Sequence, residues 1–178
     1  MRETITQNLK FFATVDYHEP ADLKQAQCFL GSGADDRGTG YFGSVVKPNG
    51  DITGVFNGDG HDGGKEAMLA AIRNGGDRGD AYAVSNETGE PNRLARFYAK
   101  FGLVPVARVP FDPEYAAPGV EPQDIVFYIR NGDSAETVAR KYGTYPPPTK
   151  EQYDALPVMS YEEARKYRDD LISGNKRK

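Results

Sequence analysis

The chain has 178 residues, of which 38% are apolar, and a formal net charge of −4 at pH 7. This length suits one domain with a tail, and the negative balance does not favour nonspecific binding of nucleic acid. A single cysteine excludes an internal disulfide framework, and no apolar run approaches the roughly 18 residues that a membrane span needs. We therefore expect a cytoplasmic protein with neither a nucleic-acid nor a membrane partner.

The first third of the chain is predicted to form a strand, a helix and a β-hairpin. Residues 9–15 are apolar between polar neighbours, which indicates a strand, and residues 22–30 carry apolar positions at helical spacing that Gly31 closes. Residues 40–46 and 52–56 are rich in β-forming side chains and flank a connector containing Asn-Gly, a strong hairpin signal.

Helices and strands alternate after the hairpin. The patterns predict, in chain order, a helix over 64–73, a strand over 80–85, a helix over 91–101 and strands over 104–109 and 124–130. Pro91 is expected at the start of the second of these helices, and Gly102 just after its end. The loop over 110–122 is too long and too rich in proline for a tight hairpin, and loops of this kind are often functional.

The last 48 residues are mostly polar and are predicted to form a helical C-terminal extension. Two capping boxes, Thr149 with Gln152 and Ser160 with Glu163, each predict the start of a helix. We expect one domain over 1–130 and the extension over 131–178. The extension contains too little apolar sequence to fold alone, so it should pack on this domain, on a second copy of the chain or on a partner protein.

The last helix is expected over 161–172, with Gly174 as its end. Its apolar line, which could dock on the domain or a partner, consists of Ala164, Tyr167 and Leu171.

The most informative stretch is the glycine-rich segment over 57–65, which lies between the hairpin and the helix over 64–73. Glycines let backbone amides converge, and the following helix directs its unsatisfied N–H groups and positive dipole end to the same point. The segment is therefore a candidate cradle for a phosphate or pyrophosphate, and the alternative is a flexible connector. It is not a Walker-type loop, because Lys65 is followed by Glu66 instead of Ser or Thr.

The order of these elements, together with Tyr98, Lys100, Gly102 and Leu103, resembles the GNAT acyltransferase family, whose signature is Tyr-x-Lys-x-Gly followed by an apolar residue. The resemblance covers roughly residues 9–130. It implies an α/β (α+β) fold with a mixed, mostly antiparallel sheet of six or seven strands flanked by helices.

The resemblance also implies an activity, the transfer of an acetyl group from acetyl-CoA to an amine on a small molecule or peptide. Tyr98 stands at the position of the family's catalytic acid, which protonates the leaving thiolate. The strand edge over 54–57 could pair with the pantetheine amides as an added strand would. The residues expected to bind the cofactor are Phe56, Asn57, Gly60, Gly63, Gly64 and Lys65.

Two other functions stay open. Gly60 stands where the family usually has Gln or Arg, which favours a catalytically silent module that keeps the fold for binding. A nucleotide-binding enzyme using the same loop is the third hypothesis. The general base is not assigned, and the candidates are Asp16, Glu19, Asp35 and Asp36. No metal site is expected, because the two histidines and one cysteine lie far apart in the sequence.

Overall fold

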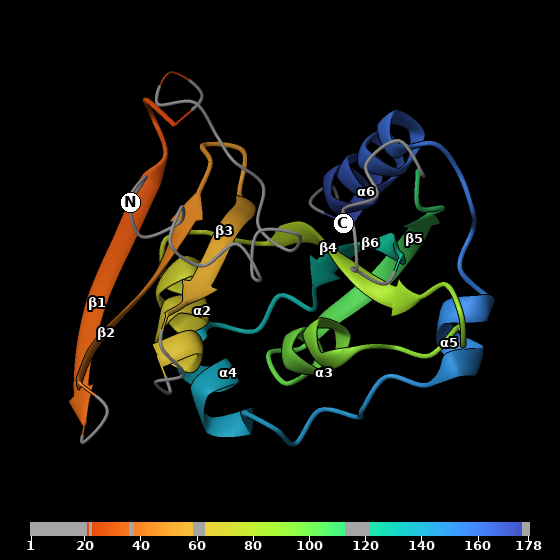
Figure 1. Ribbon diagram of the computed structural model, residues 1–178. Helices are drawn as coiled ribbons and strands as arrows, with labels where there is room; N and C mark the ends of the chain where they lie inside the picture. Colours follow the sequence, from red (N-terminus) through yellow and green to blue (C-terminus); the bar gives the residue numbers. More distant parts are fainter. Residues whose placement is uncertain (1–20, 22, 36–37, 59–62, 113–121, 176–178) are drawn as a thin grey trace. The chain divides into compact units, whose positions relative to one another are not determined.

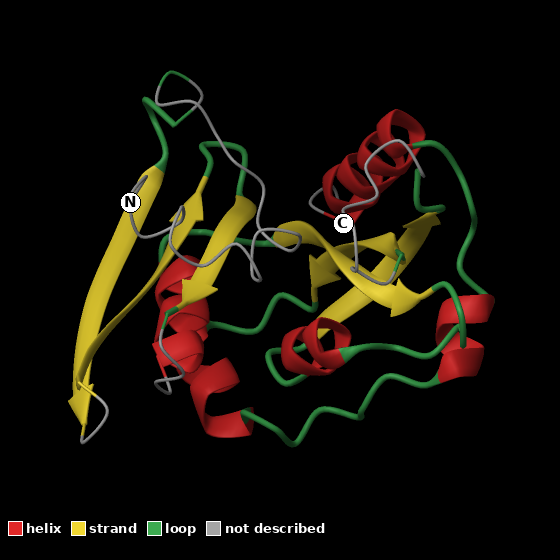
Figure 2. Cartoon of the chain, viewed as in Figure 1, coloured by secondary structure: helices red, strands yellow, loops and turns green. Residues whose placement is uncertain are grey.

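The fold was obtained as a computed structural model, which describes residues 21, 23–35, 38–58, 63–112 and 122–175 (Figures 1 and 2). The chain divides into two compact units, the first ending at Asp77 and the second starting at Arg78. Each unit contains three of the six described strands and its own helices. The class is α+β, as expected.

The first unit contains three antiparallel strands and one described helix. Its elements are β1 (Gln27–Asp35), β2 (Gly38–Val46), β3 (Asp51–Asn57) and α2 (Gly63–Arg73). The strand order is β1-β2-β3. The hairpin of β2 and β3 confirms the Asn-Gly prediction, since Gly50 has a φ of 88° and its N–H donates to the carbonyl of Lys47.

Helix α2 packs its apolar side on β2. Ala67, Met68 and Ala71 are fully buried, and the hydroxyl of Ser44 on β2 donates to the carbonyl of Ala67 at 2.7 Å. The helix ends as predicted at the glycines after Arg73, where Gly75 adopts a φ of 84°.

The second unit has three antiparallel strands in the order β4-β6-β5. Its elements in chain order are β4 (Arg78–Ser85), α3 (Arg93–Ala99), β5 (Leu103–Val109), β6 (Gln123–Arg130), α4 (Ala135–Lys141), α5 (Lys150–Asp154) and α6 (Tyr161–Asn175). The predicted strands and helices of this region are therefore present, with shifts of a few residues at their ends.

Helices cover both faces of these three strands. Phe127 and Tyr128 are neighbours on β6 and so point to opposite faces. Phe127 belongs to the apolar cluster that contains Ala164 of α6, whereas Tyr128 contacts Tyr98 of α3 and Tyr153 of α5. Figure 1 shows α6 and α3 on either side of the strands.

The C-terminal extension packs within the second unit, which is one of the three alternatives that the sequence left open. Both capping boxes form, with Thr149 and Gln152 at the start of α5 and Ser160 and Glu163 at the start of α6. The backbone of Arg108 on β5 also accepts a hydrogen bond from Met159 and donates one to Pro157. The division into domains at residue 130 stays a prediction.

The helix predicted over 22–30 was wrong. Residues from Gln27 onward form β1, where Cys28 and Leu30 lie opposite Val45 and Gly43 of β2. Pairing with a strand that follows in the chain overrides the local helical spacing, which the sequence pattern alone could not weigh.

Three finer predictions of the helical regions also need correction. Pro91 does not begin α3: it bridges to Val84, and Asn92 is the N-cap. Gly174 does not end α6, which continues to Asn175. The buried line of α6 consists of Ala164, Arg168 and Ile172 in place of Ala164, Tyr167 and Leu171. The strand expected over 9–15 lies outside the described residues.

Candidate functional site

The glycine-rich segment joins β3 to α2, as predicted. The N–H of Gly58 donates to the carbonyl of Tyr41 at 2.8 Å, so it extends the contact with β2 and is not available to a ligand. Helix α2 begins at Gly63, and its first-turn N–H groups are backbone donors of the predicted cradle within the described residues. Gly60 and His61 lie outside the described residues.

Close packing leaves no room for a side chain at Gly63. A Cβ placed there would lie 2.1 Å from the ring of Phe42, a distance that real side chains do not adopt. Gly63 is also buried. The close approach of α2 to β2 therefore explains this glycine without a ligand.

Gly54 differs, because packing does not explain it. Between the pairs Gly43–Phe56 and Val45–Thr53, two residues of β3 lie opposite one residue of β2. This is a β-bulge, and Gly54 in it has a φ of 67° with no atom within 4 Å of where a Cβ would stand. Bulges place backbone groups of the extra residue outside the ladder and recur beside active sites.

The other predicted cofactor residues surround this bulge and the start of α2. Phe56 is half-buried, and its ring lies over Gly43. Asn57 is exposed at the end of β3. Lys65 is half-buried in the first turn of α2, followed by the exposed Glu66, whose carboxylate opposes the positive charge that Lys65 offers to an anion.

Tyr98, the predicted acid, is half-buried on α3. Its ring lies edge-on to Tyr128 at 5.3 Å between centroids and tilted against Phe97 at 5.8 Å. Burial, with the charge of Asp80 as a second cause, raises the pKa of the phenol well above its ordinary value of 10.0. The phenol is protonated at neutral pH, as a proton donor must be, and its raised pKa makes it a weaker acid than an exposed tyrosine. Tyr98 belongs to the second unit, whereas the glycine segment belongs to the first.

Asn92 was missed as an organising residue. Its side chain accepts from the N–H groups of Leu94 and Ala95, and donates to the carbonyl of Tyr82 at 2.8 Å and to the Gln123 side chain. An Asn directly before an apolar helical pattern is an N-cap signal, so the sequence contained the information. The contacts give Asn92 a structural role in joining α3 to β4 and β6.

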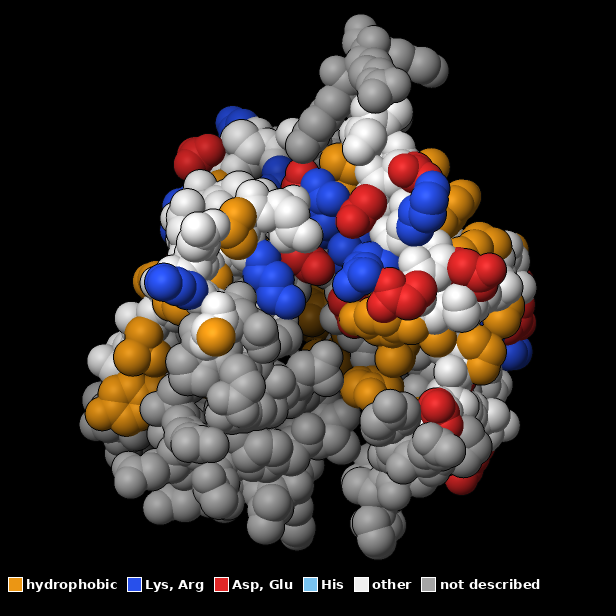
Figure 3. Space-filling view, turned by 90° about the horizontal axis from the view of Figure 1, so that it is seen from above, with side chains coloured by type: hydrophobic (Ala, Val, Ile, Leu, Met, Phe, Trp, Pro, Cys, Tyr) orange, Lys and Arg blue, Asp and Glu red, His pale blue; other side chains and the backbone are white. Residues whose placement is uncertain are grey.

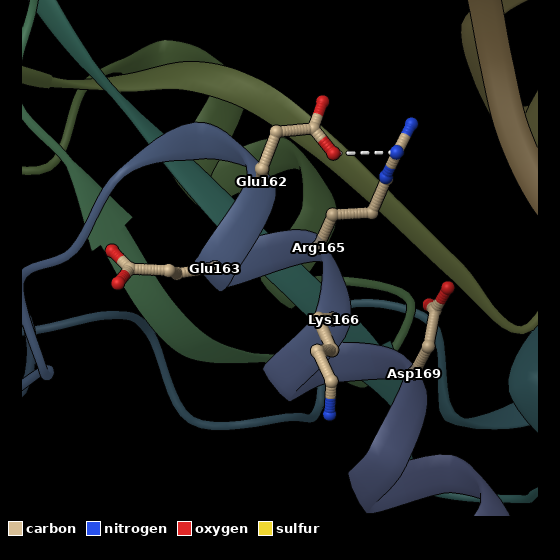
Figure 4. A pocket seen from close by; sticks show the side chains of 5 residues that line it. All are labelled: Glu162, Glu163, Arg165, Lys166 and Asp169. Atoms are coloured by element: carbon tan, nitrogen blue, oxygen red, sulfur yellow. Dashed lines mark hydrogen bonds and ion pairs between the residues drawn. The ribbon is translucent and has the colours of Figure 1, made fainter.

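A shallow hollow of about 430 Å³ lies beside α6 (Figure 4). Its charged side chains already have partners: Arg165 contacts Glu162 at 2.5 Å, Glu163 caps Ser160, and Asp169 contacts Arg78 at 3.0 Å. Figure 3 shows Lys and Arg interleaved with Asp and Glu on the face it presents, with no field of one sign. These features do not form a substrate site.

The general base stays unassigned. Asp16, Glu19 and Asp36 lie outside the described residues, and Asp35 is the last residue of β1. Among the described residues no group of three or more His, Cys, Asp or Glu could hold a metal ion. Within the same part of the chain, no helix is both long and apolar enough to cross a membrane.

Comparison of the chain with known protein families, with curated proteins and with solved structures gave no match.

Proposed function

We propose that the protein is an acetyl-CoA-dependent N-acyltransferase that acts on an amine of a small molecule or peptide. The observation that carries the proposal is the Gly54 bulge, three residues before the end of β3 and directly upstream of the glycine segment and α2. Packing accounts for Gly63 but not for Gly54.

Coenzyme A fits the chemistry of these groups. Its pantetheine arm carries amides that can bond to strand backbone released at the bulge, at Gly54 and Val55. Its pyrophosphate is an anion that suits the first-turn N–H groups of α2, with Lys65 adding positive charge.

The reaction forms a bond between the amine nitrogen and the acetyl carbon and breaks the bond between that carbon and sulfur. The nitrogen loses a proton to a base, and the departing thiolate gains one. Acetyl-CoA supplies the activated acyl group, and Tyr98 is the proposed donor of the proton to the thiolate.

Calorimetric titration with acetyl-CoA tests the cofactor site. Gly54→Ala forces a side chain into a positive-φ position without a clash, which should disturb the bulge and weaken binding about tenfold or more, or roughly 1.4 kcal/mol. Gly75→Ala is the matched control, since Gly75 also has a positive φ and open space around its Cβ, but lies after α2. It should bind like the wild type.

Equal affinities for the two variants would contradict a cofactor site at the bulge. Binding of acetyl-CoA without release of free thiol in the presence of primary amines would instead support the catalytically silent module. Titration with ATP tests the nucleotide-binding alternative with the same variants.

A further inference from the structure

Three tyrosines from three elements meet beside the proposed acid. Tyr98 of α3 lies edge-on to Tyr128 of β6, with an interplanar angle of 74°. The hydroxyl of Tyr128 is hydrogen-bonded at 3.0 Å to the hydroxyl of Tyr153 on α5. Tyr128 and Tyr153 are each only 1% exposed, so both phenols are withdrawn from water.

Tyr153 belongs to the C-terminal extension, and the residue after it, Asp154, attaches α5 to the sheet. Asp154 contacts Lys150 at 3.1 Å and Arg108 of β5 at 3.6 Å. The Thr149 capping box orders the start of the helix. The hydroxyl of Tyr153 therefore meets Tyr128 from a helix with its own attachments.

Tyr98 needs support of this kind. Helix α3 has only seven residues, and Tyr98 lies in its last turn, one residue before Ala99 ends the helix. A helix this short is not stable by itself, and its terminal turn is held mainly by tertiary contacts. The ring of Tyr128 supplies one such contact, and its own orientation is fixed by the bond to Tyr153.

We propose that Tyr128 and Tyr153 are positioning residues for Tyr98, so that the C-terminal extension is required for proton donation by Tyr98. The inference rests on the proposed function, because the orientation of Tyr98 matters only if its phenol donates a proton. It gives the extension a role in the chemistry beyond covering the sheet.

The kinetic test uses the full-length protein with acetyl-CoA and a panel of primary amines, followed by release of free thiol. Tyr153→Phe and Tyr128→Phe keep the rings and remove the hydrogen bond from either side. We expect kcat to fall about tenfold in each, less than in Tyr98→Phe, with the KM for acetyl-CoA unchanged. Tyr145→Phe is the matched control, because it removes a hydroxyl that bonds to Asp133 at 2.8 Å instead of to this cluster.

A second measurement needs no activity. The chain has eleven tyrosines and no tryptophan, so labelling with 3-fluorotyrosine gives a small set of fluorine signals, of which Tyr98→Phe identifies one. We expect Tyr153→Phe to shift or broaden the Tyr98 signal, and Tyr145→Phe to leave it in place.

An unchanged Tyr98 signal in both Tyr153→Phe and Tyr128→Phe would overturn the inference, whatever the kinetics. A changed signal with unchanged kcat would also overturn it, because the contact would then be structural only. A wild-type protein that neither binds nor consumes acetyl-CoA would overturn the proposed function, and with it the inference. This outcome can be distinguished from failure of the inference alone, because here the wild-type protein itself shows no binding or turnover of acetyl-CoA.

Discussion

Different physical constraints require glycine at different positions of this chain, and each constraint predicts a different effect of substitution. Gly63 lacks a side chain because the ring of Phe42 occupies the space where a Cβ would be. Gly54 lacks one because of its positive φ within a bulge. A test of ligand binding that replaces Gly63 would therefore disturb the packing of α2, and Gly54 is the better position.

We expect Gly63→Val to destabilise the protein by about 1–3 kcal/mol, because the new side chain must displace Phe42 or separate α2 from β2. Urea unfolding measures this loss. Gly33→Val is the control, since no atom lies within 4 Å of its Cβ position in β1 and valine suits a strand. Similar midpoints for the two variants would show that the close approach to Phe42 is not needed.

Helix α6 attaches to its sheet through an unusual residue at the centre of its buried line. Arg168 is fully buried between Ala164 and Ile172, with its Nε 3.0 Å from Asp169 and its Nη1 3.9 Å from Asp80. Its guanidinium also lies 5.2 Å from the ring centroid of Phe127. The docking of α6 therefore depends on charge compensation as well as on apolar area.

Replacing Arg168 tests how much its interactions with the two carboxylates contribute to the stability of the protein. Arg168→Met keeps most of the length of the side chain but removes the positive charge that Asp80 and Asp169 face. We expect the free energy of unfolding, measured with urea, to fall by about 1–3 kcal/mol. The loss stays below that of a fully buried pair because Asp80 and Asp169 retain 20% and 37% of their side-chain exposure.

Arg165→Met on the same helix serves as the comparison. Arg165 is exposed and contacts only the exposed Glu162 among the ion pairs described, so its replacement should change stability by less than about 1 kcal/mol. If both variants lose the same free energy of unfolding, burial of Arg168 does not increase its contribution to stability.

On the scale of the whole molecule, the C-terminal extension belongs to the same compact unit as β4, β5 and β6. It covers Phe127 with α6 and Tyr128 with α5, one on each face of the sheet. The extension is therefore part of the core of this unit.

Truncation after Arg130 should expose both of these aromatic residues. We expect the melting midpoint to fall by at least several degrees, as a loss of ~1–2 kcal/mol or more would cause, with increased binding of a hydrophobic dye. Adding back a separate peptide of residues 131–178 should restore part of the loss. A truncated protein with an unchanged midpoint would mean that the extension does not stabilise the fold.

The sequence alone determined the features that depend on residues close together in the chain. The β2–β3 hairpin follows from an Asn-Gly turn, α2 from its apolar spacing and closing glycines, and the starts of α5 and α6 from capping boxes. Each of these signals involves residues within about four positions of one another, where hydrogen bonds and helical spacing are local.

The tertiary structure decided what depends on distant partners. Residues 27–30 became a strand because β2 pairs with them, and Gly63 is glycine because Phe42, 21 positions earlier, packs on it. Arg168 is buried because Asp80 and Phe127 compensate its charge, and Tyr128 meets Tyr153 across 25 positions. A local pattern contains no information on which distant residue will be adjacent, and desolvation, close packing and charge compensation depend on that adjacency.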